Sequence, residues 1–188
     1  KTYTNIESTT DYSSQSDILV TCKSLTKKYN NKVALSNINL TLHRGNIVGL
    51  LGVNGSGKTT LLKLINGLLV PTSGEIRING LTPGIETKKI VSYLPDAAYL
   101  SNYMSAQQVI EFFADFYMDF DKKKAQEMLQ LLKLNPHMKI KEMSKGMKEK
   151  LQLILVMSRN ASLYCLDEPI GGVDPAARDY ILKTIINN

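Results

Sequence analysis

The chain has 188 residues, of which 43% are hydrophobic and 21% charged, and this composition is typical of one soluble globular domain. Its 12 glycines and 6 prolines exclude collagen-like and low-complexity classes, and no apolar run approaches the roughly 20 residues of a membrane-spanning helix. The formal net charge of +6 comes from lysines interleaved with acidic residues, which favours a solvated face, although a basic surface can also attract nucleic acid or an anionic membrane.

Cysteine usage and the first residues of the chain suggest its compartment. Cys22 and Cys165 lie among apolar or β-branched neighbours, which is typical of small buried side chains and not of a disulfide or metal framework. We therefore expect a reducing, cytosolic compartment. Residues 1–17 contain hardly an aliphatic side chain, so we expect a disordered polar tail there. No secretion leader opens the chain, and a start at Lys1 indicates trimming, a tag remnant or a fragment.

From Ile18 onward, the first half of the chain predicts a β-rich region followed by a helix. Alternating apolar residues in 18–22 and 38–42 predict one antiparallel pair of strands. The continuous apolar run 47–51 predicts a strand covered on both faces. A Gly-rich loop follows it directly, and leucines at helical spacing then predict a helix that stops at Pro71.

The second half of the chain predicts a helical insert within the sheet. Short strands are expected at 75–79 and 90–94, and the period becomes helical between 105 and 134. In the insert, Phe112, Phe113 and Phe116 share one helix face, a pattern more typical of core than of an interface. A helix over 145–159, an apolar strand over 163–166 and a last helix over 175–186 follow. This order predicts an α/β fold interrupted by a helical lobe.

One motif carries the central chemical signal. Residues 52–59 fit the phosphate-loop pattern G-x-x-x-x-G-K-[ST] between a predicted strand and a predicted helix. Glycines let successive backbone N–H groups form a nest for anions, and the helix adds the positive end of its dipole. Lys58 can reach the β- and γ-phosphates, and the Thr59 hydroxyl can ligate Mg²⁺. The candidate nucleotide-binding residues here are Gly52, Val53, Asn54, Gly55, Ser56, Gly57, Lys58, Thr59 and Thr60.

A pair of acidic residues supplies the second half of a nucleotide site. Asp167 and Glu168 directly follow the apolar strand 163–166, which would carry them to the rim of the phosphate loop. Asp167 can hold Mg²⁺ through water, and Glu168 can polarise an attacking water molecule. We therefore predict Glu168 and Lys58 as catalytic residues, with Thr59 and Asp167 at the metal.

From about Ile18 to its end the sequence resembles the ATP-binding cassette (ABC) family of transporter ATPases, a group of P-loop NTPases. The resemblance implies that Tyr29 stacks on adenine and that Asp174, in the Gly-Gly-Val-Asp loop, communicates across a dimer. Residues 143–147, Met-Ser-Lys-Gly-Met, match the family signature, in which Ser144 and Gly146 meet the γ-phosphate bound to the opposite subunit. This signature resembles a bacterial exporter-like branch.

One position departs from the family pattern. Asp96 stands where the family commonly has a Gln that senses Mg²⁺ and the attacking water. Asp96 either contacts the metal or is a loop carboxylate with no metal role, and we expect it at the metal with Thr59 and Asp167.

The resemblance implies an ATP-binding and ATP-hydrolysing subunit that powers an ABC transporter. The expected fold has a mixed or parallel core sheet, an antiparallel β subdomain and a helical subdomain at about 97–145, all within an ABC ATPase domain spanning 18–188. ATP and Mg²⁺ would be its cofactors. Two such subunits, identical or different, would pair head to tail around ATP and work with separate integral membrane subunits at the cytoplasmic face of the membrane.

Two other functions remain open at this stage. A non-transport ABC ATPase in DNA repair or translation usually carries a coiled-coil insertion or two cassettes, and neither is visible here. A small-molecule kinase would not explain the signature or the Asp167–Glu168 pair. We therefore expect no nucleic-acid partner.

The length implies a further expectation within this family. Its cassettes normally continue past the helix at 175–186 into a core strand and a switch histidine, whereas this sequence stops at Asn188. Neither His43 nor His137 matches that position. We therefore expect a C-terminally truncated cassette that hydrolyses ATP poorly.

Overall fold

The computed structural model of the chain describes residues 17–96, 100–168 and 183. The tail expected at 1–17 lies outside the described residues except for Asp17, and the helix expected at 175–186 lies outside them except for Lys183. Asp174 also lies outside them.

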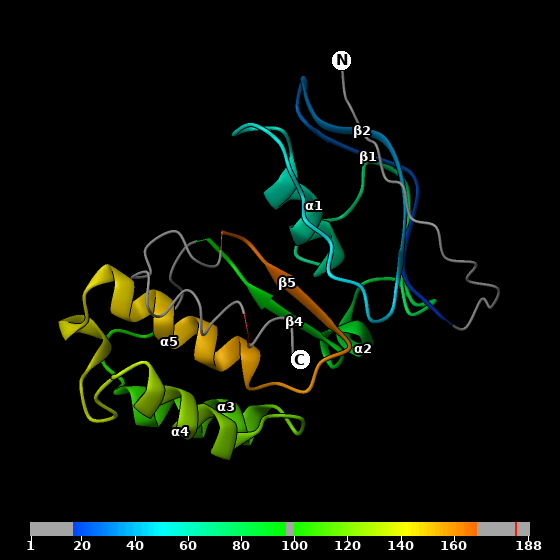
Figure 1. The fold of residues 1–188 in the computed structure, drawn as a ribbon. Helices are drawn as coiled ribbons and strands as arrows, with labels where there is room; N and C mark the ends of the chain where they lie inside the picture. The colour runs from blue at the N-terminus through cyan, green and yellow to red at the C-terminus, as the bar shows by residue number, and fades with distance from the viewer. Residues whose placement is uncertain (1–16, 97–99, 169–182, 184–188) are drawn as a thin grey trace.

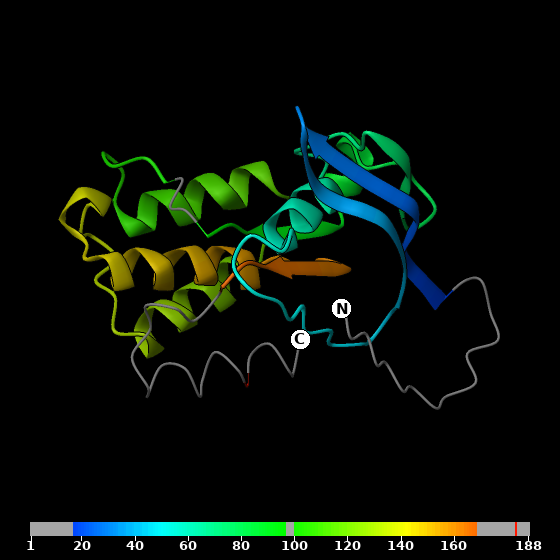
Figure 2. The same ribbon diagram turned by 90° about the horizontal axis from the view of Figure 1, so that it is seen from above.

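An antiparallel sheet in the order β2-β1-β3 forms one end of the molecule (Figures 1 and 2). Strands β1 (Ile18–Tyr29) and β2 (Lys32–His43) form the predicted hairpin, and β3 (Ser73–Ile78) pairs with the other edge of β1. The hairpin turns through Asn30 and Asn31, and Asn30 has a left-handed φ of 50°, a conformation that Asn tolerates in tight turns. The predicted antiparallel subdomain is therefore confirmed.

Two parallel strands lie between this sheet and the helices of residues 106–157 (Figures 1 and 2). Strands β4 (Val91–Leu94) and β5 (Leu163–Leu166) pair in parallel, so their carboxyl ends lie at the same edge. Helix α1 (Lys58–Ile65) and the short helix α2 (Ile85–Lys88) lie on the chain between β2 and β4. The chain thus combines antiparallel and parallel sheets with helices, as the sequence predicts.

A helical lobe occupies the opposite end of the molecule (Figure 2). Helices α3 (Ala106–Phe116) and α4 (Lys122–Leu131) form the predicted insert, and a 3-10 turn at Ile140–Glu142 leads to α5 (Lys145–Met157). Helix α5 then returns the chain to β5, and both α4 and β4 contact α5. Helix α5 therefore joins the lobe to the parallel strands.

Two hydrophobic clusters meet at the β4–β5 pair. The first contains the buried faces of α3, α4 and α5 together with Leu94, with Tyr164 and Leu166 packed against it. The second fills the space between the antiparallel sheet and α1, and includes Val91 and Cys165. Side chains alternate between the faces of a strand, so each of these strands contributes to both clusters.

The strand expected at 47–51 does not form, and this prediction was wrong. The segment has no strand assignment, and its side chains are exposed, with Leu51 96% accessible. Within the part of the chain that is described, no strand pairs with it. A continuous apolar run reflects a tendency to be buried, but a strand also needs hydrogen-bonding neighbours, which the run itself does not specify.

The aromatic face of α3 is also more exposed than its pattern predicts. Phe112 and Phe116 are exposed and stack on each other with ring centroids 6.1 Å apart, while Phe113 packs against the first cluster. The core side of α3 is formed by Ala106, Val109 and Ile110. Two of the three phenylalanines therefore lie on the surface, because the helix is rotated so that its aliphatic residues face α4 and α5.

Candidate nucleotide-binding site

A cavity of about 510 Å³ collects most of the predicted nucleotide residues. Their side chains or backbones come from the hairpin, the phosphate loop, the start of α1 and the ends of β4 and β5. The lining residues are Tyr29, Lys32, Ala34, Asn54, Gly55, Gly57, Lys58, Thr59, Thr60, Asp96 and Glu168. This volume lies within the range of small-molecule and cofactor sites.

The phosphate loop enters α1 through Gly57, which is the N-cap residue of the helix. Its φ of +97° is accessible mainly to glycine, and a Cβ built there would lie 2.6 Å from the Ala34 carbonyl oxygen. The loop backbone therefore passes closer to β2 than any side chain would permit. Gly52 is also crowded, because a Cβ there would lie 2.6 Å from Ser56 Oγ.

Lys58 begins α1 and points back over the loop. Its ammonium group donates hydrogen bonds to the carbonyl oxygens of Gly52 at 2.8 Å and Val53 at 3.1 Å. The loop also closes on itself, because the Ser56 N–H donates to the Val53 carbonyl at 3.1 Å. Gly52, Val53 and Ser56 thus shape the loop and hold its lysine, although they do not line the cavity.

The three predicted acidic residues lie at the carboxyl ends of the two parallel strands. Asp96 follows β4, and Asp167 and Glu168 follow β5. The Asp167 N–H donates to the Leu94 carbonyl at 3.0 Å, which keeps the two strand ends together. Glu168 adopts a left-handed φ of 53°, a conformation of non-glycine residues that is enriched at functional sites.

Asp167 is the most buried of these carboxylates. Its residue is only 6% exposed, and its Oδ2 atom has no hydrogen-bond partner among the described residues. The neighbouring Tyr93 hydroxyl is likewise buried without a partner there. Burial, with the nearby charge of Asp167, raises the pKa of Tyr93 to about 12, so Tyr93 stays neutral. A buried carboxylate oxygen without a partner favours a cation.

Of the signature residues, Lys145 lines a second, smaller cavity of about 190 Å³. Ser144 is the N-cap residue of α5 and accepts a hydrogen bond from the Met147 N–H at 3.3 Å. Neither Ser144 nor Gly146 lines the cavity around Lys58. The smaller cavity is lined by Leu94, Pro95, Asp96, Lys145, Glu149, Gln152, Asp167 and Glu168. It therefore places the start of α5 next to the three carboxylates.

Tyr29 stands at the outer side of the larger cavity. The residue is 43% exposed, and the Lys27 ammonium lies 5.4 Å from the centre of its ring. Lys32 and Ala34 line the same cavity and were missed by the sequence reasoning. The Asn-Asn turn was the available signal, because it pairs Lys32 directly with Tyr29 across the hairpin.

Comparison with known proteins decides the family. The sequence pattern described as "ABC transporter" matches residues 35–171, which cover most of the chain. The chain belongs to the ABC transporter family. Within this family it carries an ATP-binding cassette, as the motifs and the fold predict. In the part of the chain that is described, this cassette has no helix long and apolar enough to cross a membrane.

Several curated relatives of the cassette are ATP-binding proteins of bacterial transporters. SkfA peptide export ATP-binding protein SkfE from Bacillus subtilis is 34% identical over 88% of this chain and 73% of its own length. ABC transporter ATP-binding protein YtrB from the same organism is 30% identical over 90% of this chain and 59% of its own. Zinc import ATP-binding protein ZnuC from Hydrogenovibrio crunogenus is 39% identical over 83% of this chain and 62% of its own length. The chain thus spans between about three fifths and three quarters of these relatives.

Solved structures show the same fold. An ATP-binding subunit of an ABC transporter superposes on the cassette with a TM-score of 0.83 and 29% identity, covering 90% of this chain and 74% of that one. An ABC transporter ATP-binding protein from Pyrococcus furiosus superposes with a TM-score of 0.77 and 30% identity, covering 89% and 84%. These matches confirm the P-loop NTPase fold of the cassette.

Proposed function

We propose that this cassette binds and hydrolyses ATP and thereby powers a membrane transporter. The observation that carries the proposal is the convergence of Lys58, Thr59 and Glu168 on one cavity, although they lie on separate elements. A phosphate-binding loop and a carboxylate for the attacking water are the two parts that ATP hydrolysis requires. The ATP-binding relatives support the same reading.

The residues of the cavity have different roles in the proposed hydrolysis. The N–H groups of the loop and the Lys58 ammonium hold the phosphates, and Tyr29 offers its ring to the adenine. Glu168 accepts a proton from the water that attacks the γ-phosphorus, while the bond to the β-phosphate oxygen breaks. Positioning and charge stabilisation, rather than covalent chemistry by the protein, lower the barrier.

The acidic residues fit a magnesium ion that accompanies ATP. Thr59, Asp167 and Asp96 would hold it, and the Asp167 oxygen without a hydrogen-bond partner among the described residues supports this assignment. The described side chains include no group of three or more His, Cys, Asp or Glu placed for a metal, so the phosphates of ATP would complete the ligand set. When bound, Mg²⁺ neutralises charge on the β- and γ-phosphates.

The position of the signature supports a dimer. Ser144 and Gly146 do not line the cavity around Lys58, which supports the proposal that they would act on the ATP of a second subunit. The start of α5 would direct its N–H groups and positive dipole end at that phosphate. ATP would then join two cassettes head to tail, and hydrolysis would release them. Asp174, outside the described residues, would act across the same interface.

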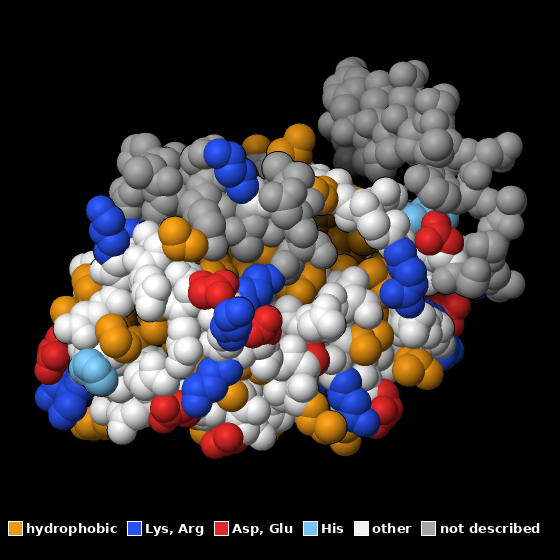
Figure 3. All heavy atoms as spheres, turned by 60° about the horizontal axis from the view of Figure 1, so that its bottom comes forward, with side chains coloured by type: hydrophobic (Ala, Val, Ile, Leu, Met, Phe, Trp, Pro, Cys, Tyr) orange, Lys and Arg blue, Asp and Glu red, His pale blue; other side chains and the backbone are white. Residues whose placement is uncertain are grey.

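The proposed partners are integral membrane subunits, which would hold the cassette at the cytoplasmic face of a membrane. Two relatives are named for peptide export and for zinc import, and the resemblance of the Met-Ser-Lys-Gly-Met signature to an exporter-like branch favours an exporter. On the face shown in Figure 3, basic and acidic side chains are interspersed, which gives a nucleic acid no continuous basic track. Co-purification with an integral membrane protein supports transport, whereas retention on DNA or ribosomes favours the non-transport alternative.

Substitution of Lys58 and Glu168 tests the ATPase in the whole protein. We expect Lys58→Ala to weaken Mg-ATP binding about tenfold or more, because it removes the charge at the phosphates. Glu168→Gln should keep ATP binding and lower kcat by roughly a hundredfold or more, because it removes the general base. Lys63→Ala, in the last turn of α1, is the matched control and should change neither value. Unchanged binding in Lys58→Ala together with unchanged turnover in Glu168→Gln contradicts the proposal.

A further inference from the structure

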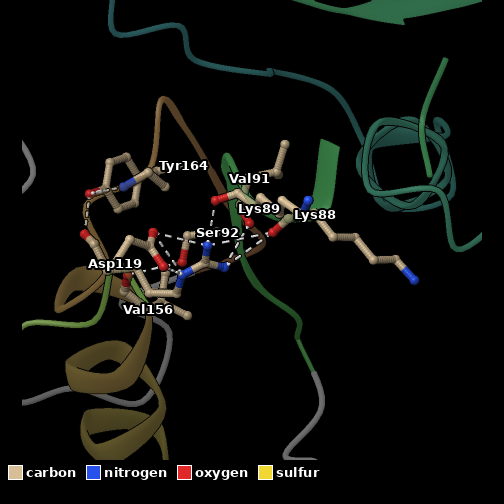
Figure 4. Close-up of polar contacts among 9 residues, drawn as sticks. Lys88, Lys89, Val91, Ser92, Asp119, Val156 and Tyr164 are labelled. Atoms are coloured by element: carbon tan, nitrogen blue, oxygen red, sulfur yellow. Dashed lines mark hydrogen bonds and ion pairs between the residues drawn. The ribbon is translucent and has the colours of Figure 1, made fainter. Parts of the chain in front are cut away.

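Arg159, two residues beyond the end of α5, is a buried arginine that uses every N–H group of its guanidinium. Nε donates to the Asp119 oxygens Oδ1 at 3.0 Å and Oδ2 at 3.1 Å, and Nη2 donates to Oδ2 at 3.0 Å. Nη2 also donates to the Lys89 carbonyl at 2.8 Å, and Nη1 donates to the carbonyls of Val91 at 3.1 Å and Lys88 at 3.4 Å. Figure 4 shows these partners surrounding one group.

The surroundings hold the arginine in place. The residue is 5% exposed, and its guanidinium carbon lies 3.9 Å from the centre of the Tyr117 ring. The Tyr164 hydroxyl donates to the Arg159 carbonyl, and Ser92 Oγ donates to the Val156 carbonyl at 3.0 Å. Backbone hydrogen bonds run alongside, from Asp121 N–H to the Ser158 carbonyl and from Asn160 N–H to the Asp119 carbonyl.

These contacts join three parts of the fold that are far apart in sequence. Asp119 lies in the connection between α3 and α4, within the helical lobe. Lys88 and Lys89 lie at the end of α2, and Val91 starts β4, whose other end leads to Asp96. The arginine itself follows α5, and Tyr164 belongs to β5, which leads to Asp167. Arg159 thus ties the lobe, the parallel strands and the signature helix at one point.

The opposite end of α5 is the end that faces the chemistry. Lys145 and Glu149 share the smaller cavity with Asp96, Asp167 and Glu168. Helix α5 has 13 residues, so it is about 20 Å long, and a tilt of about 5° at Arg159 moves Ser144 by roughly 2 Å. The anchor at one end of the helix therefore sets the position of the signature at the other.

We propose that Arg159 is a positioning residue of the ATPase, which fixes the signature helix relative to the carboxylates at the ends of β4 and β5. This inference rests on the proposed function. Lysine cannot replace the arginine, because it offers three donors from a point charge, whereas the planar guanidinium reaches a carboxylate and three carbonyls together. Arg159 lines neither cavity, so it acts through the elements that it joins.

Three substitutions in the whole protein test this role. Arg159→Lys keeps the positive charge but loses the planar set of guanidinium donors. Asp119→Asn keeps the arginine but removes its anionic partner, and Asp119→Glu keeps a carboxylate that can accept two hydrogen bonds. Met128→Ala is the matched control, because Met128 is 1% exposed in the cluster of the helical lobe and its truncation destabilises the lobe without touching Arg159. The melting temperature of each variant is measured first. The Mg-ATP dissociation constant, KM and kcat are then measured at a temperature well below it.

We expect Arg159→Lys and Asp119→Asn to lower kcat roughly 10- to 100-fold, as small displacements of a catalytic group do, while the Mg-ATP dissociation constant changes less than about twofold. Asp119→Glu should recover most of kcat, and Met128→Ala should keep it despite a lower melting temperature. Should Arg159→Lys fail to fold, Asp119→Asn carries the test. Three results overturn this inference and leave the proposed function standing. These are a wild-type kcat in Asp119→Asn, a loss of kcat in Met128→Ala equal to that in Asp119→Asn, and a loss of ATP affinity in Asp119→Asn as large as its loss of kcat. A wild-type protein that neither binds nor hydrolyses ATP overturns the proposed function as well.

Discussion

The backbone at Gly57 determines how the phosphate loop enters α1. The residue combines a φ of +97° with a packing space in which a Cβ would lie 2.6 Å from the Ala34 carbonyl and 2.7 Å from Leu35 Cδ2. Backbone atoms cannot move aside as the end of a flexible side chain can. A side chain at position 57 would therefore clash with β2, so the packing of the loop on β2 requires a glycine here in addition to phosphate binding. The motif alone does not reveal this contact.

Substitution of Gly57 by alanine should damage both the loop and the site. We expect Gly57→Ala to lower the free energy of unfolding by about 1–3 kcal/mol through backbone strain and to weaken Mg-ATP binding about tenfold or more. Urea denaturation and equilibrium ATP binding measure the two effects. Gly49→Ala is the control, because a Cβ there meets no atom within 4 Å. Equal behaviour of the two variants is the result that contradicts this account.

At the scale of elements, the helix starts of the lobe and of the signature follow one local rule. Ser105 caps α3, Asp121 caps α4 and Ser144 caps α5, each accepting a hydrogen bond from a backbone N–H inside the helix. At Ser105 the Gln108 side chain also bonds back to the Ser105 N–H at 2.9 Å, which completes a capping box. The cap of α5 differs from the others in its proposed second use, at phosphate.

The two serine caps allow this second use to be measured. Ser105→Ala and Ser144→Ala each remove one cap, so we expect each to lower the free energy of unfolding by about 1 kcal/mol. Only Ser144→Ala should also lower the ATP turnover, because Ser144 belongs to the signature proposed to meet the phosphate of a second subunit, whereas Ser105 has no proposed contact with ATP. The comparison uses denaturation and steady-state ATPase measurements. A similar loss of turnover in both variants would assign Ser144 a purely structural role.

The helical lobe was predicted more reliably than the strand at 47–51, for a physical reason. A helix forms its backbone hydrogen bonds within the segment, so the helical spacing of apolar residues between 105 and 134 already predicts that helices form there. A strand completes its hydrogen bonds with other segments, and the apolar run does not name them. The rotation of α3 that exposes Phe112 and Phe116 likewise depends on its neighbours.

At the scale of the whole molecule, burial of the two cysteines links stability to pH. Desolvation raises the pKa of Cys165 to about 12, against the smaller opposite effect of a hydrogen bond from Asn66, and it raises the pKa of Cys22 to about 11. Both thiols pack in the second hydrophobic cluster. The folded state therefore keeps their protons at pH values where the unfolded chain loses them.

The sign of the effect follows from this difference. Unfolded thiols titrate near pH 8.5, so their stabilising contribution is complete below that value and is lost as the pH rises toward 11–12. We therefore expect the urea concentration at the unfolding midpoint to decrease as the pH is raised from about 8 to about 10.5. Cys165→Ala should show a smaller fall over the same range, and a midpoint that stays flat or rises in the parent chain would contradict the prediction.

The sequence by itself determined the features that are encoded locally. Residues 52–59 specify a phosphate loop because the glycines, the lysine and the start of α1 are contiguous, and the periodicity over 105–134 specifies helices because their hydrogen bonds are internal. Family membership follows from the same motifs in their order. These conclusions need no knowledge of which segments meet.

Only the tertiary structure added Lys32 and Ala34 to the site and showed which strand pairings bring its distant residues together. The hairpin places Lys32 beside Tyr29, and the parallel pairing of β4 and β5 places Asp96 beside Asp167 and Glu168. In the same structure, residues 47–51 pair with none of the described strands. Arg159 binds Asp119 in the helical lobe and Lys89 beside β4, contacts that its charge alone does not predict. Such contacts depend on how elements pack, which local spacing does not specify.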